Sequence, residues 1–341
     1  RLDFGGTNCV IDAACASSLG AVHLAVLELR AGRSDLVLTG GVDTLNDIFM
    51  YMCFSKTPAL SPTGDAKPFD ANGDGTILGE GLGILVLKRL ADAEHDGDRI
   101  YAVLRGIGSS SDGKGNAIYA PSAAGQKKAI GNAYRLAGVT PDTIEMVEAH
   151  GTGTKVGDAV EASALAEVYG TFSRDAESAE RSTPQPPWCA IGSVKSMIGH
   201  TKAAAGAASL IKATLALYNK VLPPTLKVAE PVEPLKVSDS PFYVNTVKRP
   251  WLPRKDHPRR AAISAFGFGG SNFHAVLEEY QPGKRETDWD GSVEIVALGC
   301  NSPQELAAVS SAIDAVAATG AKAVFIEIVP QAVRRSSSRR A

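Results

Sequence analysis

Short apolar runs alternate with stretches of helical periodicity along the first 280 residues. The runs at 9–11 and 35–39 have the composition of strands, and between them the apolar positions of 17–31 recur as on one face of a helix. Strand, helix and strand in this order are typical of the βαβ unit. The pattern therefore predicts an α/β fold from the first forty residues onward.

The same alternation continues to residue 280, in two copies. Polar residues dominate 174–187, which predicts a loop there. Two similar halves that meet at one site are expected, with the first ending near residue 105. The further strands are expected at 83–87, 101–108, 144–148, 189–193, 261–264 and 273–278, and the further helices at 123–137, 159–169 and 201–217.

Composition mainly excludes classes of protein and kinds of site. The chain has 341 residues, 44% of them hydrophobic, and a formal net charge of −2, which is typical of a soluble protein and gives no reason to expect nucleic acid as a partner. Its five cysteines are scattered without a CxxC pair, which argues against a disulfide scaffold or a metal site. No apolar run approaches the length of a membrane span, and no signal peptide is visible, so a reducing, cytoplasmic location is expected.

Cys15 lies where a strand pattern changes abruptly into a helical one. Unpaired backbone N–H groups at a helix N-terminus lower the pKa of a thiol and make it more nucleophilic. The small residues around it, Ala13, Ala14, Ala16 and Ser17, leave room for a substrate carbonyl. From this position alone, a buried structural cysteine is an equally good interpretation, because free cysteine is among the most buried residue types.

Two histidines follow expected strands in similar surroundings. His150 lies in Glu-Ala-His-Gly-Thr-Gly-Thr, and His200 lies in Lys-Ser-Met-Ile-Gly-His, while a third turn of this kind is Phe-Gly-Phe-Gly-Gly-Ser-Asn at 266–272. A thiolate can attack a thioester to give an acyl-enzyme, and two neutral imidazoles can donate hydrogen bonds to an oxyanion. Cysteine with two histidines and no carboxylate partner favours carbon–carbon bond formation over hydrolysis.

These segments, in this order, resemble the ketosynthase domain of the thiolase-like superfamily over residues 1–280. The resemblance implies a layered αβαβα fold of two similar halves, from which an N-terminal part is missing. Several segments look similar to the iterative ketosynthases of polyunsaturated fatty acid and heterocyst-glycolipid synthases. Residues 281–341 resemble the linker region that follows a ketosynthase in type I synthases, as a small αβ piece with a strand at 293–298, a helix at 303–318 and a basic tail at 334–340.

The resemblance also implies roles for individual residues. Cys15 receives the acyl chain, with the N–H groups of Cys15 and Phe268 as its oxyanion hole, and His150 and His200 promote decarboxylation of a malonyl extender. Lys195 organises the two histidines. The remaining positions are implied to contact the pantetheine arm or to gate the site: Thr152, Thr154, Phe268, Gly269 and Asn272.

Two further positions are singled out within the family pattern. Ser209 stands where many discrete fatty-acid ketosynthases have a Glu that supports the lysine, which leaves the ion-pair partner of Lys195 open. Met50, Met52 and Phe54 alternate with other residues in an apolar stretch, and this alternation is compatible with plain core or with the lining of an acyl tunnel.

The expected activity is a decarboxylative Claisen condensation in polyketide or polyunsaturated fatty acid biosynthesis. The resemblance implies no directly bound cofactor and no metal, since the substrates arrive on the phosphopantetheine of an acyl carrier protein. The implied partners are that carrier, the acyltransferase and other domains of the same synthase, and a second copy that pairs through 9–11. Two alternatives stay open: a thiolase-type enzyme using coenzyme A esters, and a non-catalytic docking or dimerisation fragment.

Overall fold

The computed structural model describes residues 4–114, 117, 119–170, 187–236, 240–254, 256–280, 295–300, 302, 304 and 325–330. It divides into two units, 1–286 and 287–341. In the second unit, β11 (Ile295–Cys300) and β12 (Phe325–Pro330) form a parallel pair. The strand expected at 293–298 overlaps β11, whereas the helix expected at 303–318 and the basic tail lie outside the described residues, as does nearly all of the loop expected at 174–187.

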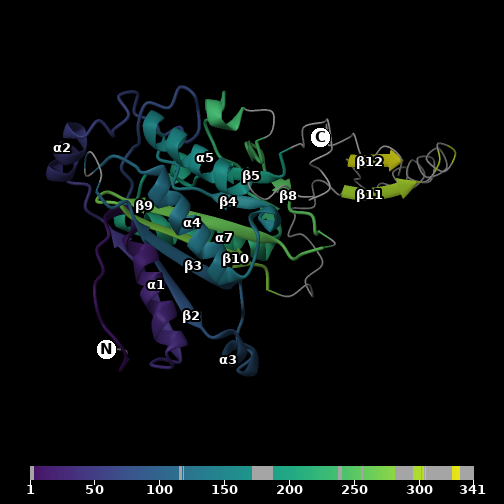
Figure 1. The fold of residues 1–341 in the computed structure, drawn as a ribbon, viewed down its shortest axis with the longest axis horizontal. Helices are drawn as coiled ribbons and strands as arrows, with labels where there is room; N and C mark the ends of the chain where they lie inside the picture. The colour runs from purple at the N-terminus through teal and green to yellow at the C-terminus, as the bar shows by residue number, and fades with distance from the viewer. Residues whose placement is uncertain are drawn as a thin grey trace. The chain divides into compact units, whose positions relative to one another are not determined.

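A six-stranded mixed sheet forms the centre of the first unit (Figure 1). β4 lies parallel to β9 and β5, while β10 is antiparallel to β9 and β3. The carboxyl end of β4 therefore lies between two parallel neighbours, which is where α/β sites form. The strands follow the order β3 (Val103–Ser111), β10 (Ser271–Glu278), β9 (Arg260–Gly267), β4 (Met146–Glu148), β5 (Cys189–Gly192) and β7 (Phe242–Val244).

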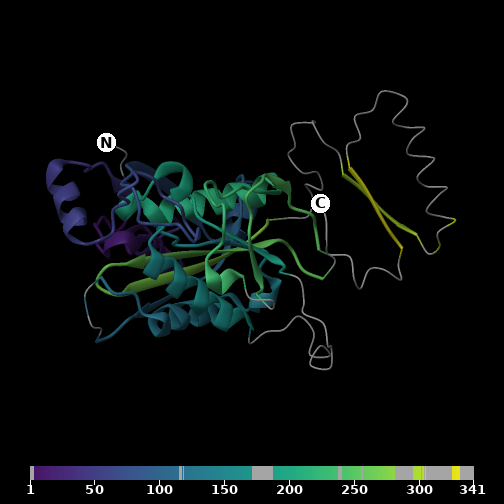
Figure 2. The same cartoon turned by 90° about the horizontal axis from the view of Figure 1, so that it is seen from above.

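Helices cover both faces of this sheet (Figure 2). α1 (Ser17–Arg30) and α7 (Ala205–Asn219) pack on one face, and α4 (Ala123–Ala137) and α5 (Lys155–Gly170) belong to the opposite side. Adjacent residues of one strand divide between the two cores, because side chains alternate across a sheet: Ala262 packs with α4 and α5, and Ile263 with α1 and α7.

A second, two-stranded sheet lies beyond α1 and α7. β1 (Leu36–Asp43) and β2 (Gly81–Lys88) pair antiparallel, and their inner face packs against these helices. Their outer face is apolar and exposed, with Leu38, Val42, Leu82, Ile84 and Val86 facing outward. The described residues thus form four layers, in the order sheet, helices, sheet and helices, which confirms the predicted layered α/β architecture. The outer helical layer expected over β1 and β2 is not found among the described residues.

The remaining elements connect these layers. They are η1 (Ala14–Ala16), α2 (Ile48–Lys56), α3 (Leu90–His95), η2 (Pro141–Thr143), α6 (Lys195–Ile198), η4 (Lys202–Ala204), β6 (Val221–Leu222), η5 (Glu233–Leu235) and β8 (Arg249–Pro250). The helix expected at 201–217 is present, but it begins as η4 and becomes α-helical only at Ala205. In the described part of the chain, no helix combines the length and the apolar character that a membrane crossing requires.

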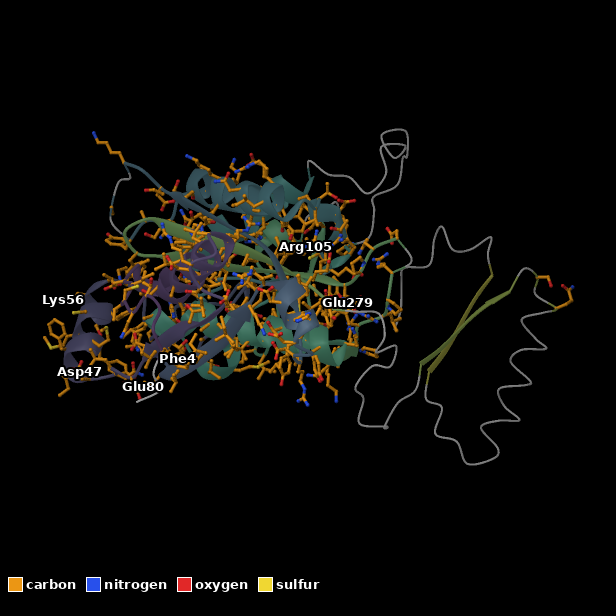
Figure 3. All side chains as sticks on the ribbon, turned by 90° about the horizontal axis from the view of Figure 1, so that it is seen from below. Phe4, Asp47, Lys56, Glu80, Arg105 and Glu279 are labelled. Carbon is orange, nitrogen blue, oxygen red and sulfur yellow. The ribbon has the colours of Figure 1, made fainter. Side chains whose placement is uncertain are left out.

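One prediction of local structure was wrong, and one alternative that the sequence left open is decided. Residues 9–11 form no strand, and Val10 is 97% exposed, because no strand of the described residues lies beside them to pair with their backbone. The stretch of Met50, Met52 and Phe54 is not core: it forms α2, and no residue of that helix is buried. Asp47 caps α2 by accepting a hydrogen bond from the Met50 N–H at 2.8 Å. Asp47 and Lys56, at the two ends of α2, lie at the edge of the first unit (Figure 3).

Candidate active site

Cys15 lies in the tight turn η1 that leads into α1. The residue before it, Ala14, has a φ of +50°, which is uncommon for any residue except glycine and is typical of functional sites. Two polar side chains hold this conformation. Asp12 Oδ1 accepts from the Ala14 N–H at 2.9 Å, and Ser17 Oγ accepts from the Ala13 N–H at 2.9 Å while donating to the Ala14 carbonyl at 2.6 Å.

Burial raises the pKa of the Cys15 thiol above its ordinary value. The positive charge of Lys195 and the N–H groups of Phe268 and Cys15 act in the opposite direction but do not outweigh burial. The prediction that the turn alone lowers this pKa was therefore wrong in its net direction. The two N–H groups that favour the thiolate are nevertheless those expected to form an oxyanion hole.

The glycine turn at the end of β9 lies against the turn η1 that carries Cys15. A Cβ on Gly267 would come within 2.2 Å of the Ala13 carbonyl oxygen, so only glycine allows this close approach. Gly270 closes the turn with a φ of +82° and an N–H bond to the Gly267 carbonyl at 3.1 Å. Asn272 fixes the far side, because its Nδ2 donates to Asp112 Oδ1 at 2.6 Å.

His150 follows β4 in a loop that two buried carboxylates of α5 hold by its backbone. Glu161 accepts from the N–H groups of His150 and Gly151 at 2.7 and 2.8 Å. Asp158 accepts from those of Thr152 and Gly153 at 2.9 and 3.1 Å. Burial raises the pKa of Asp158 to about 6 and that of Glu161 to about 7.

His200 follows α6, and its ring has a defined orientation. The Lys202 N–H donates to His200 Nδ1 at 3.1 Å, which leaves the proton of the neutral ring on Nε2. The rings of His150 and His200 lie edge to face, with centroids 5.5 Å apart. Burial, followed by the charge of Lys195, holds the pKa of both histidines well below the ordinary range, so both are neutral N–H donors at neutral pH.

Lys195 begins α6 and is almost completely buried. Its Nζ donates to the carbonyl oxygen of His150, which ties the two histidine-bearing turns together. Burial lowers its pKa, and the carboxylates of Glu148, Glu161 and Asp158 oppose that change together with Cys15. The ammonium in turn depresses the pKa of both histidines.

One cavity of about 560 Å³ brings most of these groups together. Cys15, His150 and His200 line it, as do Thr152, Thr154, Phe268 and Asn272. Of the other expected site residues, Gly269 is exposed and Lys195 lies buried behind His150, and neither lines the cavity. The ring of Phe268 stacks on that of Phe54, with centroids 6.3 Å apart, so Phe54 reaches the cavity although α2 is not core.

The sequence reasoning missed the two carboxylates that hold the His150 loop. Asp158 and Glu161 stand three residues apart in the first turns of α5, directly after the Gly-Thr-Gly-Thr segment. The sequence does hold a signal for these two residues, because they are acidic and lie in the first turns of a helix that follows a glycine-rich loop. Such residues can accept hydrogen bonds from the free N–H groups of the loop.

Comparisons with known proteins match beta-ketoacyl synthases along nearly the whole chain. Residues 1–93 match the N-terminal domain of beta-ketoacyl synthase, residues 101–229 its C-terminal domain, and residues 231–340 the ketoacyl-synthetase C-terminal extension. A polyunsaturated fatty acid synthase protein of Thraustochytrium is 47% identical over 311 residues, which are 90% of this chain and 11% of that protein. The polyketide synthase PksL of Bacillus subtilis is 45% identical over 83% of this chain and 6% of that protein.

Solved structures agree with these relatives. The ketosynthase from module 6 of the bacillaene synthase of Bacillus subtilis superimposes with a TM-score of 0.74 and 42% identity, over 91% of this chain and 52% of that chain. A PfaC ketosynthase–chain length factor structure gives a TM-score of 0.72 and 36% identity, over 81% of this chain and 28% of that chain. This chain thus spans about half of one ketosynthase structure and a small part of the curated synthases. It belongs to the beta-ketoacyl synthase family and has the thiolase-like ketosynthase fold.

Proposed function

We propose that this chain catalyses the decarboxylative condensation of an acyl group on Cys15 with a malonyl thioester. The observation that supports this most strongly is one cavity lined by a cysteine and by two histidines whose pKa values are held low. Neutral imidazoles donate hydrogen bonds without taking up a proton, which is what a developing enolate requires. Membership of the family favours this reaction over thiolase-type condensation of coenzyme A esters.

In the first half-reaction, the Cys15 sulfur attacks the carbonyl carbon of an acyl-pantetheine thioester. The N–H groups of Cys15 and Phe268, which already favour negative charge at this sulfur, receive the oxyanion. When the intermediate collapses, the bond to the pantetheine sulfur breaks, and the proton of the Cys15 thiol leaves on that sulfur. The acyl group then remains on Cys15.

In the second half-reaction, the malonyl thioester loses carbon dioxide. The electron pair of the broken carbon–carbon bond forms an enolate, whose oxygen accepts from Nε2–H of His200 and from the ring N–H of His150. The enolate carbon attacks the acyl carbonyl on Cys15, the carbon–sulfur bond breaks, and a β-ketoacyl thioester departs. Cys15 is left as a thiolate, close to the ammonium of Lys195, and takes a proton from solvent.

The remaining expected residues serve binding and access in this proposal. The hydroxyls of Thr152 and Thr154 lie 2.9 Å apart on the cavity wall and suit hydrogen bonds to the pantetheine arm. Phe268 is 41% exposed and stacked on Phe54, which suits a gate. Asn272 fixes the glycine turn through Asp112, and Gly269 gives that turn its freedom, with a φ of +92°.

The test is intact-protein mass spectrometry after incubation with acyl-pantetheine thioesters of increasing length. Cys15→Ala is compared with Cys53→Ala, which removes an exposed cysteine on α2. We expect one acyl mass increment in the parent chain and in Cys53→Ala, and none in Cys15→Ala. A folded parent chain that gains no increment would show that this proposal is wrong.

The proposal includes partners and setting. The relatives are large synthases, which supports an acyl carrier protein and other domains of one synthase as partners. No directly bound cofactor or metal is needed, because the substrate arrives on phosphopantetheine. Cys9, Cys15, Cys53 and Cys189 are free, which supports a reducing, cytoplasmic setting. We assign residues 1–280 to the ketosynthase and 281–341 to the region that follows it.

A non-catalytic fragment is the second candidate, and one observation favours it. The outer face of β1 and β2 exposes six large apolar side chains, Leu36 among them, as expected of a surface that a partner covers. The mass-spectrometric test separates the two candidates, since a fragment that only docks has no need to take up an acyl group on Cys15.

A further inference from the structure

Glu148 is a charged side chain with no solvent exposure and no role in the reaction described above. It ends β4, two residues before His150, and its side chain is 0% exposed. Its Oε1 accepts from the Val194 N–H at 2.6 Å, and Lys212 Nζ of α7 lies 2.6 Å from its Oε2. A carboxylate this deeply buried is costly unless it is paired and hydrogen-bonded, and here both conditions hold.

These contacts join three elements behind the active site. Val194 immediately precedes Lys195, so the bond from its N–H fixes the start of α6, which leads to His200. Glu148 itself is on the strand that leads to His150. Lys212, on α7, pairs with the other oxygen of the carboxylate. One side chain therefore sets the relative position of both histidine-bearing turns.

Lys195 needs a negative partner, and its direct contact does not provide one. Its ammonium donates to the His150 carbonyl, which is neutral. Asp158 and Glu161 are occupied with the backbone N–H groups of the His150 loop, and the pKa of Glu161, at about 7, leaves it partly protonated at neutral pH. Among the groups that raise the pKa of Lys195, Glu148 has the largest effect.

We propose that Glu148, held by Lys212, is the positioning residue that aligns Lys195 and the two histidine-bearing turns for decarboxylation. In this proposal, Glu148 does for Lys195 what a Glu at position 209 does in many discrete fatty-acid ketosynthases. The supporting carboxylate here lies on β4 rather than on α7. Its catalytic consequence rests on the proposed condensation, whereas its electrostatic consequence does not.

The electrostatic consequence has a definite sign. Removing the charge of Glu148 lowers the pKa of Lys195, so Lys195 loses its proton at a lower pH. The ammonium is the charge that most favours the Cys15 thiolate, and Glu148 is not one of the main groups that shift the pKa of Cys15. Losing the ammonium therefore raises the pKa of Cys15. The groups that face Lys195 are Glu148 on β4, Asp158 and Glu161 on α5, Cys15 on η1, and the rings of His150 and His200.

The test compares Glu148→Gln, Lys212→Met and the double variant with Ser209→Ala. Glutamine keeps an oxygen that can accept from the Val194 N–H but removes the charge. Ser209 is a matched control, because it is buried on the same helix and its Oγ lacks a hydrogen-bond partner among the described residues. Thermal unfolding establishes that each variant is folded, and the double variant has no unpaired buried charge to destabilise it.

Two readouts are made on the full chain. The first is the pH dependence of iodoacetamide alkylation at Cys15, which needs no substrate. It is measured with Cys9 replaced by alanine in every variant, because the exposed Cys9 lies on the same peptide. The second is carbon dioxide release from malonyl-pantetheine. In Glu148→Gln, we expect the alkylation midpoint to rise by at least about half a pH unit. In the double variant the rise should be smaller, because removing the Lys212 ammonium offsets part of the lost negative charge. We expect carbon dioxide release to fall by about tenfold or more, with KM changed by less than about threefold. Ser209→Ala should match the parent chain in both readouts.

The outcomes separate this inference from the proposed function. An alkylation profile that stays unchanged in folded Glu148→Gln overturns the inference, whatever the condensation activity. A shifted profile in a chain that releases no carbon dioxide supports the electrostatic role of Glu148 and refutes the condensation. Loss of thermal stability with unchanged profiles would show that Glu148 is only structural, and would also overturn the inference.

Discussion

The two histidines differ from ordinary surface histidines in charge, and this difference decides what they can do. Burial and the nearby ammonium of Lys195 keep the pKa of both rings well below its usual range. For His200, the Lys202 N–H also selects the tautomer that donates from Nε2. A protonated ring would hold its proton at Nδ1 as well and would lose that bond.

We expect His200→Ala to slow carbon dioxide release by about 10²–10³-fold, because it removes one of two donors to the enolate oxygen. Acylation of Cys15 should stay within a few-fold of the parent chain, since the N–H groups of Cys15 and Phe268 serve that step. Single-turnover measurements of both steps check this. His95→Ala, at the exposed end of α3, is the control, and an equal loss of both steps in His200→Ala would contradict the division of labour.

A second residue-scale prediction concerns Glu161. Its pKa in the fold is about 7, above its ordinary 4.5, so the folded protein binds this proton more tightly than the unfolded chain. The stability that this proton contributes is present below pH 4.5 and is lost as the pH rises to about 7. It amounts to about 3 kcal/mol.

Urea unfolding at several pH values across the window from pH 4.5 to about 7 measures this dependence. We expect Glu161→Gln to be less stable overall but to show a shallower fall across the window. Glu167→Gln, an exposed position on the same helix, should keep the slope of the parent chain. An identical slope in Glu161→Gln would mean that another group binds the proton.

At the scale of elements, periodicity predicted most helices and strands because each buries one face inside this chain. The failures share one physical cause. The strand expected at 9–11 has no neighbour in the described residues. Helix α2 buries none of its apolar residues, although Phe54 stacks on Phe268, so in both places much of the apolar pattern is uncovered by the described residues. The sequence alone shows that a segment is apolar but not whether its partner is present.

Which residues form the candidate site could be predicted better from the sequence than the pKa values of those residues. Cys15, His150 and His200 each follow an expected strand, and the structure places all three on one cavity. The net rise in the pKa of Cys15 could not be foreseen, because it depends on how deeply the turn is buried. Asp158 and Glu161 were missed for a related reason, since their function depends on which backbone groups point at them.

The exposed face of β2 gives an element-scale prediction. Leu82, Ile84 and Val86 point outward, while Leu85 and Leu87 pack inward against the core. Replacing the three outward residues with threonine should reduce binding of an apolar dye such as ANS by about half or more, and should reduce aggregation, with little change in thermal midpoint. Leu85→Thr should instead lower the midpoint. Unchanged dye binding in the triple variant would show that the dye binds to a different surface.

At the scale of the whole molecule, the exposed segment before Cys15 is the expected site of pairing between two copies. Residues 4–10 are exposed, and Val10 contacts almost nothing in the single chain. If two copies pair here, Val10→Asp should shift sedimentation from dimer to monomer while leaving the stability of the monomer unchanged. Val42→Asp, on the exposed face of β1, is the comparison. A dimer that survives Val10→Asp would place the interface at another surface.

The strand order of the large sheet determines how long its early strands wait for their neighbours during synthesis on the ribosome. β3 and β4 are made early, but they are not neighbours: the β9–β10 hairpin, made last, lies between them. At ordinary translation speeds, roughly ten to thirty seconds separate β3 from that hairpin. Until it arrives, both early strands present bare edges, and the turn that holds Cys15 lacks Gly267 to rest against. The nascent chain is therefore most in need of a chaperone during this interval, and the turn that carries Cys15 is among the last parts of the fold to form.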